Sequence, residues 1–370
     1  MKTEIDKLKK IISKKNYKRI LIISGKKSFF YSGAQKLCNR IIDKNQKELF
    51  SYFKKSSFPE IDELKRIILF IKKVNPDLIF AIGGGSVLDY AKIANSLAYS
   101  HSIKRDILNG SSKNLKKFCP LLAIPTTAGS GAEITPNAVI YIGKIKYSVE
   151  SNILRPDYNF LIPELVIGNS KKLKSSAGFD AISQAIESLI SRKSTGQSVN
   201  FAMESLKISL KNYLYFVKKP TLNNSFNMIK AAHLSGKAIA ISKTTAPHAL
   251  SYPFTAHWGV SHGHAVSLTL NDFLIFNYKN IHKSDCNFDL KKRFEKIFSV
   301  TKTRNIIELN DYLNKIKSEA NLNQDFNRFG INLDKNYSKI IDGVNIQRLS
   351  NNPIKLTKKD IRAILLKKII

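Results

Sequence analysis

The sequence has few cysteines, few acidic residues and no long apolar run. Its three cysteines, Cys38, Cys119 and Cys286, lie far apart and form no CxxC pair. This spacing argues against a disulfide framework or a cysteine zinc site and is typical of a reducing compartment. No stretch approaches about 18 consecutive apolar residues, and the lysine-rich start, MKTEIDKLKKIISKK, has no signal-peptide core. We therefore expect a cytoplasmic protein without a membrane span.

Acidic residues are outnumbered by basic ones, with 28 Asp and Glu against 61 Lys and Arg and a net charge of +33. Such an excess can indicate a nucleic-acid surface, an anionic membrane surface or an anionic substrate. The lysines, however, stand singly or in pairs between apolar residues, with no long basic block. This even distribution predicts a solvated surface, so we expect neither a nucleic-acid nor a membrane partner.

A chain of 370 residues is too long for one core, so two domains are expected. Over residues 1–163, helical patterns alternate with short apolar strands: KRILIIS (18–24), LFSYF (49–53), DLIFAI (77–82) and PLLAIP (120–125). This order predicts an α/β domain whose parallel, Rossmann-like sheet carries helices on both faces and binds ligands at its strand ends. Residues 164–370 show long helical patterns instead, which predict an all-α domain.

Two turns rich in glycine follow neighbouring predicted strands. AIGGGSVLD (81–89) runs from a strand into a helix, and TTAGSGAE (126–133) follows the next strand. Successive glycines let backbone approach a ligand, and the free N–H groups of a helix start favour a phosphate. An ordinary strand-to-helix turn is the alternative, since the spacing is not GxGxxG.

Histidines are concentrated in HALSYPFTAHWGVSHGHA (248–265), which holds four of the seven. Asp180 and Gln184, four apart in a predicted helix, share one helix face. Together with His248 and His262 they form a donor set for Zn²⁺ or Fe²⁺, in which Gln184 is the weak member. Satisfied core polar groups or a solvated loop are the alternatives for each histidine.

These motifs carry a resemblance to a known family. AIGGGSVLDYAK, LLAIPTTAGSGAEITPNAV, GFDAISQAIES and PHALSYPF with HGHAV, in this order, resemble the iron-containing (group III) metal-dependent alcohol dehydrogenases. The resemblance implies the dehydroquinate synthase-like fold of that family, with a dinucleotide-binding domain and a helical metal-binding domain. KTTAPHALSYPFT, Gln184 and RLSNNPIKLTKKDI look most similar to its phosphonoacetaldehyde reductase branch.

Functional residues follow from the resemblance by position. The implied cofactor contacts are Gly25, Gly83, Gly84, Gly85, Ser86, Thr126, Thr127 and Ser130. The implied metal ligands are Asp180, Gln184, His248 and His262. The implied catalytic residues are His262 and Tyr252, where Tyr252 stands at the place of a family histidine and Gln184 at the place of another. His257 and His264 are expected to lie on the surface or outside the ligand set.

The resemblance also implies a cofactor and a reaction. Many members have Asp where this chain has Gly25, and Gly25 followed by Lys26 and Lys27 can accept a 2′-phosphate, so among NAD(P)H forms NADPH is favoured. The expected reaction is hydride transfer between the nicotinamide and a small aldehyde or alcohol. The branch resemblance implies an anionic substrate, with phosphonoacetaldehyde reduced to 2-hydroxyethylphosphonate. Cations in pocket-forming stretches are Lys146, Arg155, Lys243 and Arg348. A homo-oligomer is expected.

Two other functional classes remain open from the sequence. The same scaffold can serve a polyol or sugar-acid dehydrogenase, or a dehydroquinate synthase-like lyase that uses its cofactor without net change. A non-catalytic nucleotide-binding protein is the third hypothesis, since Gln184 weakens the donor set.

Overall fold

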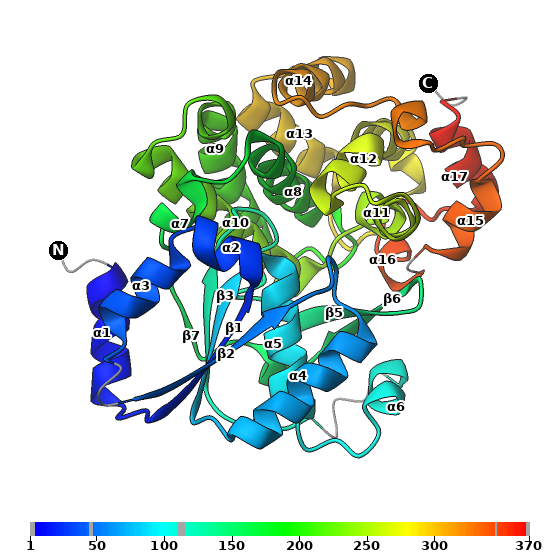
Figure 1. Cartoon of the computed structure of the whole chain (residues 1–370). Coiled ribbons are helices and arrows are strands. Elements are labelled where there is room, and N and C mark those ends of the chain that lie inside the picture. The colour runs from blue at the N-terminus through cyan, green and yellow to red at the C-terminus, as the bar shows by residue number, and fades with distance from the viewer. Residues whose placement is uncertain (1–3, 44–46, 110–114, 345, 368–370) are drawn as a thin grey trace. The chain divides into compact units, whose positions relative to one another are not determined.

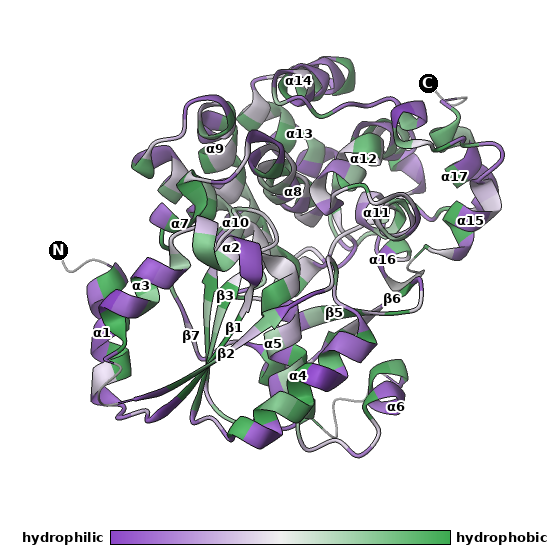
Figure 2. Cartoon of the chain, viewed as in Figure 1, coloured by the Kyte–Doolittle hydropathy of each residue, from purple (hydrophilic) through white to green (hydrophobic). Residues whose placement is uncertain are grey.

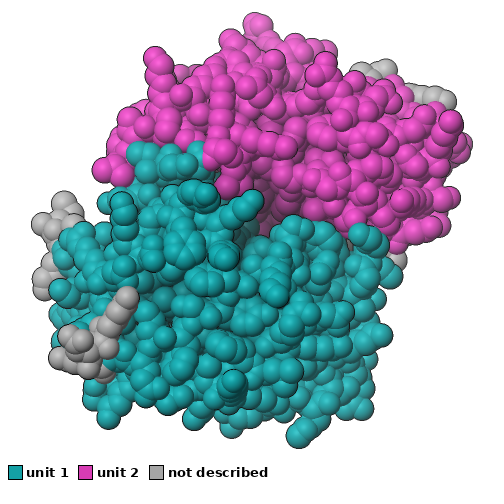
Figure 3. Space-filling model, in the orientation of Figure 1, with its two compact units in different colours: residues 1–169 teal, residues 170–370 magenta. Residues whose placement is uncertain are grey.

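The computed structural model describes residues 4–43, 47–109, 115–344 and 346–367 of the chain. It divides into two compact units, Met1–Asn169 and Ser170–Ile370 (Figure 3). Residues 164–169 therefore group with the first unit. In the described part of the chain, no helix combines the length and the hydropathy that crossing a bilayer requires.

The first unit is built on a parallel sheet in the order β2-β1-β3-β4-β7 (Figure 1). Its strands are β1 (Arg19–Gly25), β2 (Glu48–Lys54), β3 (Leu78–Gly83), β4 (Leu121–Pro125) and β7 (Tyr158–Asn159). A separate antiparallel hairpin joins β5 (Asn137–Ile142) to β6 (Ile145–Glu150) through Gly143, whose φ is 62°. Its helices are α1 (Glu4–Lys14), α2 (Lys26–Tyr31), α3 (Ala34–Ile41), α4 (Ile61–Val74), α5 (Gly85–Leu97), α6 (Ile103–Leu108), the 3-10 turn Asn152–Leu154 and α7 (Glu164–Ile167).

Alternate residues of the central strands enter two separate cores. Leu21, Ile79 and Leu121 pack with α4 and α5, whereas Ile20, Phe80 and Leu122 pack with α1 and α3. Strands covered on both faces are apolar in consecutive positions, as residues 20–23 of β1 and 78–82 of β3 are (Figure 2). The predicted α/β sheet with helices on both faces is therefore confirmed.

The second unit contains helices and no strand among its described residues, which confirms the predicted all-α character. Its helices are α8 (Lys171–Ile190), α9 (Gly196–Lys218), α10 (Leu222–Ser242), α11 (Ala246–Trp258), α12 (His262–Lys279), α13 (Leu290–Thr301), α14 (Ile306–Glu319), α15 (Tyr337–Asp342), α16 (Ile346–Leu349) and α17 (Lys358–Leu365), with 3-10 turns at Ile281–Lys283 and Phe326–Phe329. Helix α8 packs against α9, α10 and α12 and is buried over most of its length. Thr357 and Asp360 form a capping box at the start of α17.

Helices α8 and α12 approach each other closely at Gly263. A Cβ atom on Gly263 would lie 2.0 Å from the Ser176 carbonyl oxygen and 2.8 Å from the Asp180 Cβ. Backbone cannot move aside as a side chain can, so only glycine permits this contact. The position of Gly263 thus sets the distance between the start of α12 and the middle of α8.

We expect Gly263→Ala to destabilise the protein by about 2 kcal/mol, because the added methyl group forces α12 away from α8. Thermal and denaturant unfolding measure the change. Gly196→Ala is the matched control, since a Cβ at Gly196 meets no atom within 4 Å in the structure. Equal stability of Gly263→Ala and the control would contradict the proposed close packing.

Candidate functional site

The two glycine-rich turns meet at the carboxyl end of the sheet in the first unit. Gly83 and Pro125 are paired across β3 and β4, and the Thr126 N–H donates to the Gly83 carbonyl at 2.9 Å. A Cβ on Gly85 would lie 2.8 Å from the Ser130 Oγ, and one on Gly84 would lie 3.4 Å from the Thr127 Cγ2. The structure therefore brings the residues predicted to hold the cofactor into one surface, with Gly84 as the N-cap of α5.

The start of α5 in this surface is suited to a phosphate. The first N–H groups of a helix have no partner inside the helix, and the helix dipole favours negative charge there. Gly84 has no side chain that could cap them, and Ser86 is partly exposed. The arrangement is the one used by parallel α/β domains to bind a pyrophosphate group.

A buried lysine that the sequence interpretation missed supports the second turn. Lys92 on α5 is 1% exposed and donates to the Ala132 carbonyl at 2.7 Å, the Thr135 Oγ1 at 2.9 Å and the Asn137 carbonyl at 2.7 Å. Burial lowers the pKa of Lys92 to about 8. Its place seven residues after Gly85, about two helical turns along α5, could have indicated this role.

Gly25 ends β1 at the same edge of the sheet, followed by the exposed Lys26 and Lys27 on α2. A Cβ on Gly25 would lie 2.9 Å from the Ser28 Oγ, which is the end of a short side chain that can rotate. Its nearest other neighbour is a Val87 methyl group at 4.0 Å, on the first turn of α5. The three predicted cofactor segments thus lie at neighbouring strand ends.

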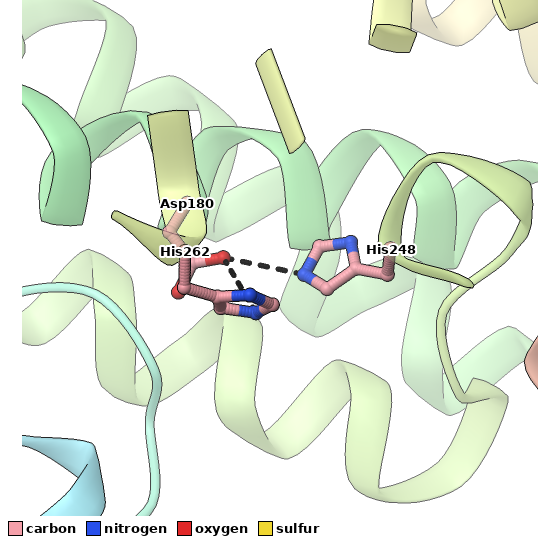
Figure 4. A group of neighbouring side chains, drawn as sticks. All are labelled: Asp180, His248 and His262. Atoms are coloured by element: carbon pink, nitrogen blue, oxygen red, sulfur yellow. Dashed lines mark hydrogen bonds and ion pairs between the residues drawn. The ribbon is translucent and has the colours of Figure 1, made fainter. Parts of the chain in front are cut away.

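Asp180, His248 and His262 converge in the second unit, from α8, α11 and α12 (Figure 4). Their nearest ligand atoms all lie within 4.8 Å of one another. The His248 Nε2 is 3.2 Å and the His262 Nε2 is 3.9 Å from the same oxygen, Asp180 Oδ1. The side chains of Asp180 and His248 are 5% and 4% exposed, whereas that of His262 is 35% exposed, which leaves one side of the cluster open.

Glu187 holds His248 in the orientation that a metal ligand needs. Its Oε2 accepts a short hydrogen bond from the His248 Nδ1, and its Oε1 accepts from the Thr245 N–H and hydroxyl at 2.9 and 2.8 Å. This bond keeps a proton on Nδ1 and turns the Nε2 toward Asp180, where a metal ion would replace the Nε2 proton. Burial by itself lowers the pKa of His248, but the charges and hydrogen bonds of Glu187 and Asp180 raise it to about 9.

The sequence interpretation missed Glu187, although a pattern could have indicated it. Glu187 lies seven residues after Asp180, on the same face of α8, and is fully buried in the structure. Its carboxylate also lies at the start of α11, where the helix dipole stabilises a negative charge. One side chain therefore both starts α11 and orients its histidine.

His262 is oriented by two residues of α11. Its Nδ1 lies 3.3 Å from the Ser251 Oγ, whose own proton goes to the His248 carbonyl at 2.7 Å, so the Nδ1 is the donor. The Tyr252 ring stacks on the imidazole at a centroid distance of 6.0 Å and an angle of 18°. Burial raises the pKa of Tyr252, against the lowering effect of Arg348, so its hydroxyl keeps its proton.

Gln184 lies beside the cluster with its amide turned toward Asp180. The Nε2 donates to Asp180 Oδ2 at 3.1 Å, and the Oε1 lies 2.9 Å from the Ser235 hydroxyl. In this orientation Gln184 holds Asp180 in place, and its oxygen faces Ser235. The structure thus gathers three of the four predicted ligands around one point and places the fourth next to them.

The donor set fits a divalent ion of the zinc or iron type. One carboxylate and two imidazoles with oriented Nε2 atoms are three ligands of the kind found in catalytic sites, which leave a position for substrate or water. Each ligand is held by a second residue: Asp180 by Gln184, His248 by Glu187, and His262 by Ser251. Such support is typical of a metal site.

The other residues singled out from the sequence lie outside this cluster. The His264 Nε2 donates to the Asn323 carbonyl at 2.7 Å, and burial lowers the pKa of His264. His257 contacts the Trp258 ring edge at a centroid distance of 5.5 Å. Lys146 and Arg155 belong to the first unit. Lys243 and Arg348 belong to the second, where the charge of Arg348 acts on Tyr252.

We expect Glu187→Gln to weaken metal binding about 10- to 100-fold, as loss of a carboxylate partner of a ligating histidine does. An amide nitrogen opposite the Nδ1 would favour the other tautomer and place the proton on the Nε2. Metal content and competition with a chromophoric chelator measure the affinity. Glu204→Gln is the control, because Glu204 is half-exposed and pairs with Lys230 on the next helix. Unchanged affinity in Glu187→Gln would show that metal binding does not depend on the contact between Glu187 and His248.

The chain is similar to several characterised proteins along most of its length. Among curated proteins it is 32% identical to phosphonoacetaldehyde reductase of Streptomyces viridochromogenes over 225 residues, 58% of this chain and 57% of that protein. It is 25% identical to long-chain-alcohol dehydrogenase 1 of Geobacillus thermodenitrificans over 318 residues, 83% of this chain and 78% of that protein. The match thus spans just over half the length of the first relative and most of the second.

Solved structures show the same fold. Sulfoacetaldehyde reductase from Bifidobacterium kashiwanohense in complex with NAD⁺ superimposes with a TM-score of 0.85 at 24% identity, covering 99% of this chain and 95% of that one. The iron-containing alcohol dehydrogenase of Thermotoga maritima does so with 0.83 at 26%, covering 99% and 95%. Residues 2–163 match the model named iron-containing alcohol dehydrogenase, and residues 174–369 match the C-terminal model of the Fe-containing alcohol dehydrogenase family. The chain therefore belongs to the iron-containing alcohol dehydrogenase family of oxidoreductases.

Proposed function

We propose that the chain catalyses reversible, nicotinamide-dependent reduction of a small aldehyde, assisted by a divalent metal held by Asp180, His248 and His262. The observation that carries this proposal is the convergence of these three side chains, each held by a second residue. Family membership and the glycine-lined surface in the first unit support it. NAD⁺ is bound in the solved sulfoacetaldehyde reductase, which has the same fold.

Each part of the proposed reaction has a residue in this chain. When bound, the metal supplies Lewis-acid polarisation of the carbonyl group and the reduced nicotinamide supplies the hydride. Gly83, Gly84, Gly85 and Ser86 bind the pyrophosphate, and Thr126, Thr127 and Ser130 line the ribose and nicotinamide side. The Tyr252 hydroxyl, which keeps its proton because burial raises its pKa, donates a hydrogen bond that orients the substrate oxygen.

We further propose an aldehyde that carries an anionic group, with phosphonoacetaldehyde as the first substrate to test and 2-hydroxyethylphosphonate as its product. Two similar proteins are named for the reduction of such aldehydes: the phosphonoacetaldehyde reductase and the sulfoacetaldehyde reductase. Turnover of propanal in preference to phosphonoacetaldehyde would overturn this substrate and leave the dehydrogenase proposal intact. Assays at 340 nm also separate a dehydrogenase from a lyase, which shows no net change in cofactor.

Removal of the metal is expected to abolish aldehyde reduction, and reloading with Fe²⁺, Zn²⁺ or Mn²⁺ to restore it. His248→Ala should lose about 10³-fold in kcat/KM, corresponding to several kcal/mol of transition-state stabilisation. His282→Ala is the control, since His282 is exposed on a 3-10 turn of the same unit. A metal-free enzyme that retains full activity would refute the metal-assisted reaction, and metal binding without any turnover would favour a non-catalytic nucleotide-binding protein.

The cofactor proposal favours NADPH over NADH and depends on Gly25. In Gly25→Asp we expect the preference for NADPH, as the ratio of kcat/KM values, to fall about tenfold or more, because a carboxylate binds the ribose hydroxyls and repels a 2′-phosphate. Rotation of the Ser28 hydroxyl makes room for the new side chain. Gly33→Asn at the next turn, where φ is 89°, is the control. Equal use of both cofactors by the wild type would contradict the proposal.

A further inference from the structure

Arg348 is a cation of the second unit that acts on a tyrosine beside the candidate metal cluster. It lies on α16, which packs against α11, and its charge acts on Tyr252 of α11, whose ring stacks on His262. The Asp180 carboxylate also acts electrostatically on Tyr252. Tyr252 therefore contacts the proposed metal ligand His262 with its ring and is also influenced by the charge of Arg348.

The chain around Arg348 is fixed against α11. A Cβ on Gly343 would lie 2.9 Å from the Pro253 Cβ, so the turn after α15 contacts α11 directly beside Tyr252. Lys339 on α15 places its ammonium group 5.3 Å from the Trp258 ring centroid, on the same helix. Because proline is rigid, the approach at Gly343 sets how close α16 comes to Tyr252.

Asn351 and Asn352, which follow Arg348 closely in the chain, bind its segment to α10, to the loop after α10 and to α12. The amide of Asn351 is 3% exposed and donates to the Ser242 and Thr244 carbonyls at 2.8 and 2.9 Å. Asn352 is 1% exposed and exchanges two hydrogen bonds with Asn277 at 2.8 and 3.2 Å. Arg348 is therefore held on a fixed segment, which lowers the entropic cost of using it to bind a ligand.

The Asn351 contacts also place Arg348 next to the loop that leads into α11. Between the two carbonyls that Asn351 binds lies Lys243, whose φ of 63° and ψ of 176° are rare for a residue with a side chain. The same loop continues to Thr245, which donates to Glu187. The segment with Arg348 and the supports of His248 thus form one connected structure.

From this geometry we infer that Arg348 is a specificity-determining residue that binds the oxyanion group of a short aldehyde substrate while the carbonyl end lies at the Asp180–His248–His262 cluster. A guanidinium suits this role because its planar set of N–H donors can bond a hydroxyl and an oxyanion together. Phosphonate, sulfonate and carboxylate groups share the required chemistry. The inference rests on the proposed function and extends it by naming the side chain that binds the anionic group of the substrate.

The test compares charged and uncharged aldehydes in the metal-loaded enzyme. We expect Arg348→Gln to lower the ratio of kcat/KM for phosphonoacetaldehyde to that for propanal about tenfold or more, mainly through KM, and Arg348→Lys to lower it less. Arg304→Gln is the control, since the Arg304 side chain is 88% exposed and pairs with Glu308 on α14. If both aldehydes lose activity equally, Arg348 acts only through Tyr252 and the inference is wrong.

A binding measurement separates this inference from the proposed function. Calorimetry on the Zn²⁺-loaded protein, with NADPH present so that no turnover occurs, compares 2-hydroxyethylphosphonate, 2-hydroxyethanesulfonate and 4-hydroxybutyrate with 1-propanol. We expect Arg348→Gln to weaken one or more of the three anions about tenfold or more without a matching loss for 1-propanol. Equal affinities in wild type and variant for every anion would overturn the inference even if propanal is reduced. Absence of any aldehyde reduction by the wild type would instead overturn the proposed function.

Discussion

The contact between Glu187 and His248 is the interaction on which the candidate metal site depends. A buried carboxylate is costly unless charges and hydrogen bonds compensate it, and Glu187 obtains this compensation from the start of α11 and from the imidazole. The same contact leaves the His248 Nε2 facing Asp180. Because α8 supplies Asp180, Gln184 and Glu187 from one face, the rotation of this single helix sets the geometry of a carboxylate, its amide partner and the support of a histidine.

Close packing supplies the second constraint. His262 begins α12, and the next residue, Gly263, contacts the backbone of α8 at Ser176. The distance between Asp180 and His262 is therefore set by a contact that contains no side chain on the α12 side. A metal site built in this way is sensitive to small changes in helix packing, since interiors pack densely and cannot absorb an added methyl group.

In the first unit, the sheet and a buried charge hold the turns at the strand ends in place. Its parallel strands place three glycine- and hydroxyl-bearing turns at one edge, and Lys92 ties the helix after the first turn to the chain after the second. An ammonium group that is almost fully buried is tolerated there because three oxygen atoms accept its protons. The surface proposed for the cofactor is thereby held by the sheet register and by one internal cation.

The sequence by itself determined the architecture and the identity of most chemical groups. Alternation of apolar strands and helical patterns predicted the parallel sheet, and the loss of strand patterns after about residue 163 predicted the helical region, because these periodicities reflect which faces are buried. The clustering of histidines indicated His248 and His262, and the spacing of Asp180 and Gln184 on one helix face indicated two oxygen donors. The bounds of α4, Ile61–Val74, follow directly from its apolar spacing.

Only the tertiary structure decided how these groups are oriented. No local pattern shows that Glu187 supports His248 or that Arg348 acts on Tyr252, because these partners lie 61 and 96 residues apart. Spacing places Gln184 beside Asp180, but which end of its amide faces Asp180 depends on packing. Side-chain orientation is a property of contacts between elements, whereas periodicity records only burial within one. The fold could therefore be predicted from the sequence. Which residues are candidate ligands and which hold those ligands in place was decided by the packing of the helices.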